Sequence, residues 1–570
     1  MLLLVVLLPL PEDGALAQTA AEGVYMEERE GFIHMKVWGS SREIGYIQGK
    51  YLASLIERGM AAYAHLTELR YGMSWDEVRL HGVTYWPYVD QEYREEILGM
   101  AEGAAEGGAV NPSGDAVDWI DILSYNAMWD IWWRYSYVQK RLPGPRSDDV
   151  IPLHHCSAFV ATGSATEDGG FVMGQNLWMP YFLIPAHAVF IDITPPKGHR
   201  ILMEVTAGMI WSGTEWYIND AGLVVAETTL GVGPYQWGGT PSFIRIRKAV
   251  QYASSIDEFV SIMLENTNGA YSSDYLIADA KTNEVAILEL GSEKWALKRT
   301  SDGFLGSCNY PWDESVAEEL GAPQGWEHSC YPRYVRWQQL YEQYAGKINC
   351  QLGMAFLGDH YDTVEERINP CSHTLCGHVE NASGYPHGSM DAKVVNRTMA
   401  ARMETWARYG HSCGQPFLKE VHAKEHPEYA FPDLIDMIAR PWTTFGAVDR
   451  FSVTAVGSEG EPLEGMEVVL KSLYTNLTYH MLTGSGGRAH HPAVQRGEYI
   501  LEVEGPCGVH REFITVEGET HLTVRISSPE EGRLPGRILP WVAALLLVIV
   551  SLFAFKKKYI IGRFHPSRQR

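Results

Sequence analysis

The sequence of 570 residues is short of positive charge, short of cysteine, and almost without long apolar runs away from its two ends. Lys and Arg number 46 against 70 Asp and Glu, which gives a formal net charge of −24. Six of the positive charges stand in residues 556–570, so the rest of the chain carries about −30. A surface this acidic argues against nucleic acid as a partner and against docking on anionic lipid by charge.

A recognisable structural zinc motif is also missing. There are eight cysteines, but no CxxC is followed by a second CxxC or by a pair of histidines at zinc-finger spacing. His154 and His155 are adjacent and have no carboxylate ligand nearby, which is poor geometry for a metal. The sequence therefore predicts neither a metal nor another cofactor.

The two ends of the chain carry its apolar runs. Residues 1–17 read as a signal peptide that is cleaved after Ala17, and residues 538–555 supply 18 uncharged residues, the lower limit for a transmembrane helix. Residues 556–570 form a basic tail, which the positive-inside rule places in the cytoplasm. We therefore expect a single-pass protein of the cell membrane with its main domain outside the cytoplasm.

An exported chain of this kind should pair some of its cysteines. Closeness in the sequence makes Cys330 with Cys350, and Cys371 with Cys376, plausible disulfides, although connectivity cannot be read from sequence. Three Asn-X-Ser/Thr sequences are candidate glycosylation sites, at Asn381, Asn396 and Asn476.

The sequence pattern changes from helical to strand-like near residue 156. We expect residues 22–155 to be mostly helical after one short strand, because apolar residues recur there at helical spacing. From 156 to 300 short β-branched runs alternate with Gly and Asp turns, interrupted by amphipathic helix over 240–266, and helical material returns from about 332 to 440. Residues 156–445 are thus predicted to be an α+β domain of sheets covered by helices.

Residues 449–528 alternate strand patterns with Gly-rich turns and predict a small β-sandwich. The stretch "EGEPLEGMEVVLKS…TGSGGRA…GEYILEVEG" resembles the carboxypeptidase-regulatory or transthyretin-like modules of cell-surface proteins. A spacer between the main domain and the membrane is the expected role.

A single thiol stands at the point where helix gives way to strand, in "LHHCSAFVATGSATEDGGFVMGQNLW". Cysteine is most often a small buried hydrophobe, and core packing is the simplest alternative for Cys156. However, Cys156 follows a loop rich in Pro, Gly and Asp and heads a strand that a second strand, ending in the polar "GQN", would flank. If the preceding peptide bond is cut, the thiol gains its own α-amine, with an ordinary pKa of about 8, as a base.

This stretch resembles the start of the catalytic chain in the phospholipase B-like proteins. More broadly it resembles the cysteine N-terminal-nucleophile hydrolases, with the penicillin-forming acyltransferase and the bile-salt and penicillin-V hydrolases. The resemblance extends through "SGTEWYINDAGLVVAETTL", "NTNGAYSSDYLIAD", "GSCNYP" and "CYPRYVRW", over roughly residues 30–440. It implies a four-layer αββα sandwich with a helical pro-region, activated by cleavage between His155 and Cys156, with Cys156 as the nucleophile.

The resemblance also implies the rest of the site. Asn309 would be an oxyanion-hole amide and Arg333, with Arg336 as second candidate, would orient the nucleophile and lower its pKa. The strand beside Cys156 would line the site with Gln175, Asn176 and Trp178. Each residue has a structural alternative, since Asn176 could cap a turn, Arg333 could form an ion pair and Trp178 could be core packing.

Three functions remain open on the sequence. The first is hydrolysis of an acyl amide, or of an acyl ester as the phospholipase B-like name implies, through a Cys156 acyl-enzyme. The second is acyl transfer to an amine on the same fold, and the third is an inactive surface or adhesion protein. The expected partners are a small acylated substrate and the protein's own cleaved pro-region.

Overall fold

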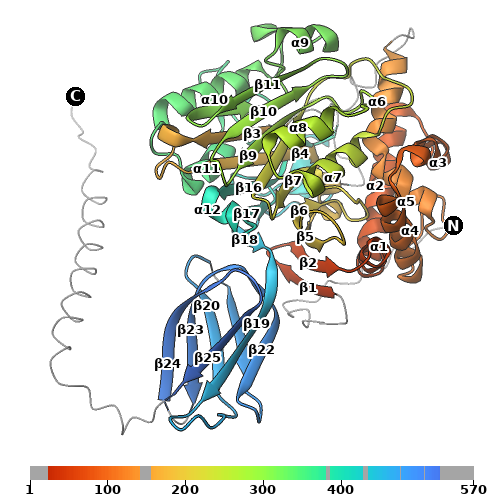
Figure 1. The fold of residues 1–570 in the computed structure, drawn as a ribbon. Helices are drawn as coiled ribbons and strands as arrows, with labels where there is room; N and C mark the ends of the chain where they lie inside the picture. Colours follow the sequence, from red (N-terminus) through yellow and green to blue (C-terminus); the bar gives the residue numbers. More distant parts are fainter. Residues whose placement is uncertain are drawn as a thin grey trace, which may run out of the picture.

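The computed structural model describes residues 24–140, 156–380, 385–427, 434–475, 477–505 and 508–526. Two large β-sheets lie face to face in the main body, and a separate β-sandwich, drawn in blue, extends from one end of it (Figure 1). Helices cover the outer face of each large sheet (Figure 1). The described chain is therefore a mixed α/β structure built from several sheets.

The first large sheet has nine strands, and only its β2–β5 pair is parallel. Its strands are, in spatial order, β1 (Val24–Arg29), β2 (Phe32–Trp38), β5 (Val189–Thr194), β6 (Ile201–Val205), β7 (Gly213–Asn219), β8 (Leu223–Thr229), β9 (Ser273–Asp279), β10 (Val285–Leu290) and β11 (Trp295–Thr300). The apolar runs that predicted strands between residues 189 and 300 all form strands of this sheet.

The second large sheet is antiparallel and has seven strands. They are, in spatial order, β12 (Gly303–Ser307), β3 (Ser157–Thr162), β4 (Val172–Pro180), β16 (His387–Asn396), β17 (Glu404–Tyr409) and β18 (Thr443–Gly446), with β15 (His378–Val379) paired to β16. The prediction that residues 332–440 are helical was wrong for this sheet's strands β15, β16 and β17.

Helices pack on the two outer faces. The nine-stranded sheet is covered by α1 (Ser41–Tyr51), α2 (Ala53–Tyr71), α3 (Trp75–Gly82), α4 (Gln91–Glu106), α5 (Trp119–Asn126), α6 (Met128–Gln139), α7 (Ser242–Tyr252) and α8 (Ile256–Leu264). The seven-stranded sheet is covered by α10 (Tyr331–Tyr344) and α11 (Cys350–Leu357). Three shorter helices are α9 (Glu314–Leu320), α12 (Arg397–Ala401) and α13 (Lys419–Glu425).

Strand β3 shows why these sheets are buried on both faces. Its sequence SAFVAT has no charged residue, and every position is buried. Ala158 and Val160 belong to the core between the two sheets, whereas Phe159 and Ala161 pack under α10 and α11. Because side chains alternate along a strand, a continuous apolar run is what a strand between two packed layers requires.

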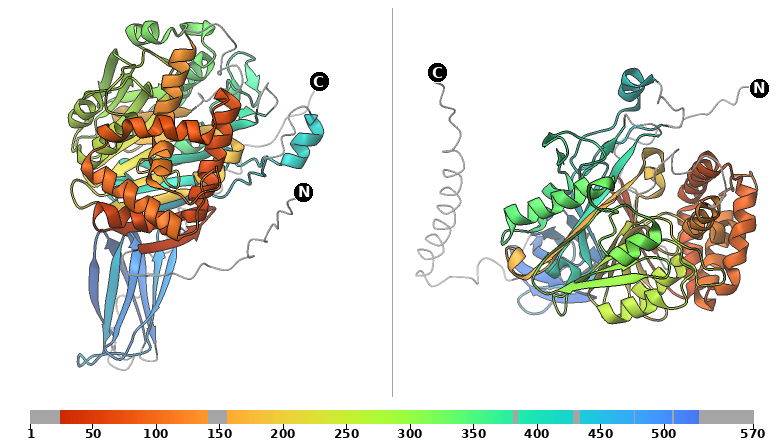
Figure 2. Two further views of the ribbon diagram at one scale, coloured as in Figure 1. Left: turned by 90° about the vertical axis from the view of Figure 1, so that its right-hand side faces the viewer. Right: turned by 90° about the horizontal axis from the view of Figure 1, so that it is seen from above.

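The segment predicted as a separate pro-region is built into the main body. Strands β1 and β2 form one edge of the nine-stranded sheet, with β2 parallel to β5. Helices α1 to α6 gather on one side of the body (Figure 2) and share one continuous hydrophobic core with the sheet. A cut before Cys156 would therefore leave two pieces that stay packed together.

The β-sandwich consists of a three-stranded and a four-stranded sheet around its own core. Its strands are β22 (Arg488–Gln495), β19 (Val448–Val456) and β25 (Thr520–Arg525), and β21 (Thr478–Leu482), β20 (Glu467–Ser472), β23 (Gly497–Gly505) and β24 (Gly508–Val516). Arg200 of the main body binds Asp449 at 2.9 Å and so ties the two units together.

Two predictions about the chain's setting are corrected. Among the described residues, no helix combines the length and the apolar character needed to cross a bilayer. The predicted fold class, which ended in a transmembrane helix, and the predicted single-pass membrane location are therefore wrong as far as the described chain goes. The predicted segments themselves, namely residues 1–17, 538–555 and 556–570, lie outside it, as do Asn381 and Asn476.

The suggested disulfides are not formed either. Cys350, Cys371 and Cys376 are free thiols, so neither the Cys330–Cys350 nor the Cys371–Cys376 bond is present. The sulfur of Cys371 contacts the Asp362 carboxylate, whereas the sulfur of Cys376 contacts His378 and Ser412. Proximity in the sequence did not predict a Cys371–Cys376 disulfide correctly, because the two side chains contact different partners.

Helices α1 and α4 approach each other unusually closely. Each carries two glycines four residues apart, Gly45 and Gly49 on α1 and Gly99 and Gly103 on α4. A Cβ atom at any of the four would lie 1.9–2.1 Å from a carbonyl oxygen of the facing helix. The helices therefore pack backbone against backbone, which only glycine permits.

Replacing Gly49 by Ala should destabilise the protein, although Ala is the better helix former by about 1 kcal/mol. The added methyl group would meet Met100 O at 2.1 Å, so the helices must separate. We expect the free energy of unfolding, measured by chemical denaturation, to fall by about 1–3 kcal/mol. Ala105→Leu, on the exposed face of α4, is the control and should change it by less than about 0.5 kcal/mol.

Candidate active site

Cys156 lies directly before β3, the strand next to the edge strand β12 in the seven-stranded sheet. Its neighbour Ser157 is paired with Asn176 on β4, so the thiol stands beside the strand that carries the predicted site residues. The residue is only 4% exposed. His154 and His155, and with them the predicted cleavage point, lie outside the described residues.

The main chain of Cys156 is held on both sides by two buried side chains. Its N–H donates to Asn309 Oδ1 at 2.7 Å, and its carbonyl oxygen accepts from Arg333 Nη1 at 2.5 Å. Arg333 Nη2 donates to the same Asn309 oxygen at 3.0 Å, so the two side chains are joined. We call this pair the Asn309–Arg333 clamp. Its bonds to a buried guanidinium are charge-assisted and therefore strong.

Different elements place the two members of the clamp. Asn309 follows β12, the strand that pairs with β3, and has a φ of 65°, in the left-handed region that Asn tolerates better than most residues. Its Nδ2 donates to Thr229 O at 2.7 Å, which fixes the orientation of the amide. Arg333 lies in the first turn of α10 and is fully buried. The clamp thus joins a sheet end to a helix end at Cys156.

The three predicted residues of β4 are all buried and face two ways. Gln175 points between the sheets and donates to Glu227 O on β8 at 2.8 Å. Asn176 points to the helical side, where its Nδ2 donates to Leu357 O at 2.7 Å and to Leu375 O at 2.9 Å. The Arg333 guanidinium lies over the Trp178 ring, 4.7 Å from its centroid, in a cation–π contact. The fold therefore places Trp178 against the clamp.

The electrostatic environment keeps the Cys156 thiol protonated in the continuous chain. Burial, and then the nearby Glu227 carboxylate, raise the pKa of Cys156 to about 12. Hydrogen bonding from the Trp178 main chain and the charges of Arg333 and Lys393 act in the opposite direction. Burial also raises the pKa of Glu227 to about 7. The Cys156 thiol would thus need a proton acceptor close by to form the thiolate at neutral pH.

A buried charge cluster that the sequence analysis missed lies between the sheets. Lys393 on β16 binds Glu204 on β6 at 2.7 Å and also binds Asp391. Lys393 and Glu204 are completely buried. The signal was a lysine and an aspartate inside the apolar stretch "GSMDAKVVN", because charges in a buried strand need partners. The second candidate arginine, Arg336, lies apart from Cys156 and binds Asp359 at 2.9 and 2.8 Å.

Comparisons with known proteins give partial similarities. No family model matches the sequence. An uncharacterised protein from Archaeoglobus fulgidus is 26% identical over 240 residues, which are 40% of this chain and 36% of that relative. The chain thus matches about a third of that relative's length.

Two solved structures are neighbours of part of the chain. A mutant of the conjugated bile acid hydrolase from Clostridium perfringens covers 44% of this chain and 88% of its own, with 12% identity and a TM-score of 0.28. Penicillin V acylase from Agrobacterium tumefaciens covers 45% and 83%, again with 12% identity and a TM-score of 0.28. At this level of similarity the function must be argued from this chain's own residues. The finer phospholipase B-like assignment stays a prediction.

The raised pKa of Cys156 predicts slow alkylation of the uncut chain. At pH 8 a thiol with a pKa near 12 is about 10⁻⁴ thiolate, the reactive form, and the fraction rises tenfold for each pH unit. Iodoacetamide labelling read by peptide mass spectrometry should therefore be negligible in native uncut chain at pH 7–8. The denatured chain is the control, since its thiol regains an ordinary pKa. If Cys156 in the native uncut chain were labelled as fast as in the denatured chain, its pKa would not be raised.

Proposed function

We propose that the protein is a cysteine hydrolase of acyl amides in which Cys156 becomes an N-terminal nucleophile. The observation that carries the proposal is the Asn309–Arg333 clamp. A cysteine that only fills the core needs no partners beyond packing. Two buried polar side chains that bind the main-chain N and O of one cysteine instead fit a residue whose own amine and thiol must be held in place.

Cleavage of the chain would form the catalyst. The Cys156 sulfur attacks the carbonyl carbon of the preceding residue, the C–N bond breaks, and the nitrogen takes up the thiol's proton to become a free amine. Water then hydrolyses the thioester, which leaves a carboxylate on the first piece and a thiol on Cys156. The freed amine stays next to Asn309 Oδ1, because the N–H already donates to that oxygen at 2.7 Å.

Turnover would use the same atoms. The amine, rather than a distant side chain, accepts the thiol proton, and the thiolate attacks the acyl carbon of the substrate. The tetrahedral intermediate collapses as the amine returns the proton to the leaving nitrogen. Water, activated by the same amine, then releases the acid and restores the thiol.

The geometry suggests a different role for Asn309 from the one implied by the resemblance. Its Nδ2 is committed to Thr229 O, while its Oδ1 faces the Cys156 nitrogen. We therefore assign Asn309 to positioning the amine. Arg333 would orient Asn309 and, through its charge, favour the thiolate, since it already lowers the pKa of Cys156 against the effect of burial.

The first test is the state of the purified full-length chain. Intact-mass analysis and N-terminal sequencing should find a chain that begins at Cys156, and the two pieces should co-elute in gel filtration because they share one core. Cys156→Ala should stay uncut. The cut protein should hydrolyse members of an acyl-amide panel, with phospholipids and added amine acceptors as the competing substrates.

Two results would contradict the proposal. One is a wild-type chain that stays uncut after prolonged incubation and behaves identically to Cys156→Ala, which would favour the inactive surface protein. The other is equal hydrolysis by wild type and Cys156→Ala. Faster product formation in the presence of an amine acceptor would move the assignment to acyl transfer.

Arg333→Lys tests the clamp, with Arg336→Lys as the matched control on the same helix. Lysine keeps the charge but cannot bond Cys156 O and Asn309 Oδ1 together, because it lacks the planar fork. We expect kcat/KM to fall by about 10²-fold, as for loss of one preorganised donor. Arg336→Lys should stay within about threefold, since the ion pair of Arg336 with Asp359 lies away from Cys156. An equal fall in kcat/KM in the two variants would show that the Asn309–Arg333 clamp has no specific role in the reaction.

A further inference from the structure

Four side chains of the types that can bind a metal ion meet on the helical side of the seven-stranded sheet. They are His360, Cys376, His378 and Cys413, and their ligand atoms all lie within 4.8 Å of one another. Cys376 and His378 are buried, and His360 and Cys413 are half-buried. The sulfur and nitrogen donors are the set that zinc prefers in structural sites.

Three separate segments supply the four residues. His360 comes from the turn between α11 and β13 (Tyr361–Asp362), and Cys413 comes from the turn after β17. Cys376 lies just before β15, and His378 is the first residue of β15. The chain spacing matches no compact zinc motif, and for this reason the sequence predicted no site. The fold brings the segments together because β15 and β17 both pair with β16.

The distances suit a tetrahedral ion. His378 Nε2 lies 3.4 Å from Cys376 Sγ and 3.5 Å from Cys413 Sγ. An ion with Zn–S of about 2.3 Å and Zn–N of about 2.0–2.1 Å in tetrahedral geometry separates S from N by about 3.6 Å. The distances from His378 Nε2 to the two sulfurs are therefore close to the S–N distance expected around a tetrahedral zinc ion. His360 Nε2 is buried and makes no hydrogen bond to a described residue.

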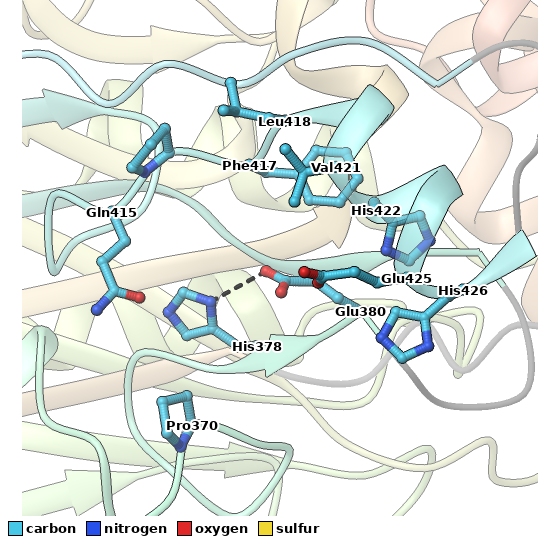
Figure 3. A pocket seen from close by; sticks show the side chains of 11 residues that line it. Pro370, His378, Glu380, Gln415, Phe417, Leu418, Val421, His422, Glu425 and His426 are labelled. Atoms are coloured by element: carbon cyan, nitrogen blue, oxygen red, sulfur yellow. Dashed lines mark hydrogen bonds and ion pairs between the residues drawn. The ribbon is translucent and has the colours of Figure 1, made fainter.

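Outer contacts complete the arrangement. The other ring nitrogen of His378, Nδ1, bonds Glu380 Oε1 at 3.0 Å, which leaves Nε2 to the sulfurs (Figure 3). A carboxylate behind a histidine is the usual support of a metal-bound imidazole. Ser412 Oγ lies 3.2 Å from Cys376 Sγ, and Gln415 N donates to Cys413 Sγ at 3.4 Å. Each sulfur therefore has a polar group beside it, and the Gln415 N–H would stabilise the Cys413 thiolate.

We propose that His360, Cys376, His378 and Cys413 bind one Zn²⁺ as a structural Cys₂His₂ site. The two other groups of candidate ligands nearby are weaker. In one, His411 already uses both ring nitrogens, on Gln415 O and Tyr181 Oη at 2.9 Å each. The other, around Cys371, offers three ligands and includes the Asp362 carboxylate, which is held by main-chain N–H groups.

The site would hold the wall of the candidate active site in place. Leu375 O, next to Cys376, and Leu357 O, near His360, are the two acceptors of the Asn176 amide. Gly377, between two ligands, packs so tightly on Trp178 that a Cβ there would lie 2.0 Å from the indole ring. The zinc would thus fix the two loops on which Asn176 and Trp178 rest.

Metal content of the full-length chain, expressed with zinc, tests the site. Elemental analysis should find about one zinc per chain, and a chelator should remove it with exposure of two thiols to a thiol reagent. Cobalt added to the zinc-free chain should give the sulfur-to-cobalt charge-transfer absorption and the intense visible bands of a tetrahedral thiolate site. This readout needs no variant and no catalytic activity, so its outcome is separate from that of the proposed hydrolase.

Variants localise the metal. Cys413→Ser and His360→Ala should abolish stoichiometric zinc, whereas Cys371→Ser, in the neighbouring group, should retain it. Glu380→Gln keeps all four ligands and should weaken zinc binding by about 10–100-fold in a competition with a chelating dye. Because Glu380→Gln keeps all four ligands, weaker zinc binding in this variant would not be explained by a chain that fails to fold.

Two outcomes would overturn the inference. The first is a zinc-free protein in which non-reducing peptide mapping finds a disulfide between Cys376 and Cys413, which is the other chemistry open to two neighbouring cysteines in an oxidising setting. The second is zinc that survives in Cys413→Ser or is lost in Cys371→Ser, because the ion would then lie outside these four residues.

Discussion

The charge-assisted hydrogen bonds of Arg333 are the interaction on which the candidate site depends. A buried guanidinium is tolerated only where its donors are used, and Arg333 uses them on the Cys156 carbonyl, the Ser157 hydroxyl and the Asn309 amide. One face of the guanidinium lies on Trp178. One side chain from α10 therefore fixes the start of β3, the end of β12 and the helical side of β4 relative to one another.

The fold explains how a chain could be cut there without falling apart. The residues on either side of position 156 contribute strands to the same body, and β2 lies parallel to β5 inside one sheet. Helices α1 and α4, locked together by four glycines, sit in the same hydrophobic core as the nine-stranded sheet. Hydrolysis of one peptide bond would expose little buried surface, so a cut before Cys156 would affect the stability of the fold only locally.

The polar groups of the interior are divided between two tasks. Near Cys156 they shift proton affinities, since burial and Glu227 hold the thiol's pKa high while Arg333 and Lys393 oppose this. On the helical side of β4, the sulfur and imidazole groups around His378 lie beside the loops that support Asn176 and Trp178. The groups that shift the pKa of Cys156 are thus different from those that lie beside the supporting loops.

Local sequence determined the strands between residues 157 and 300, with a thiol directly before β3, because continuous apolar runs and Gly-Asp turns act over a few residues. It misplaced β15 to β17, since the charges of Asp391 and Lys393 look unfit for a buried strand until Glu204 faces them from the other sheet. The partners of Asn309 and the gathering of His360, Cys376, His378 and Cys413 were decided only by the tertiary structure. Contacts between residues dozens of positions apart depend on how sheets stack, and no local pattern encodes that.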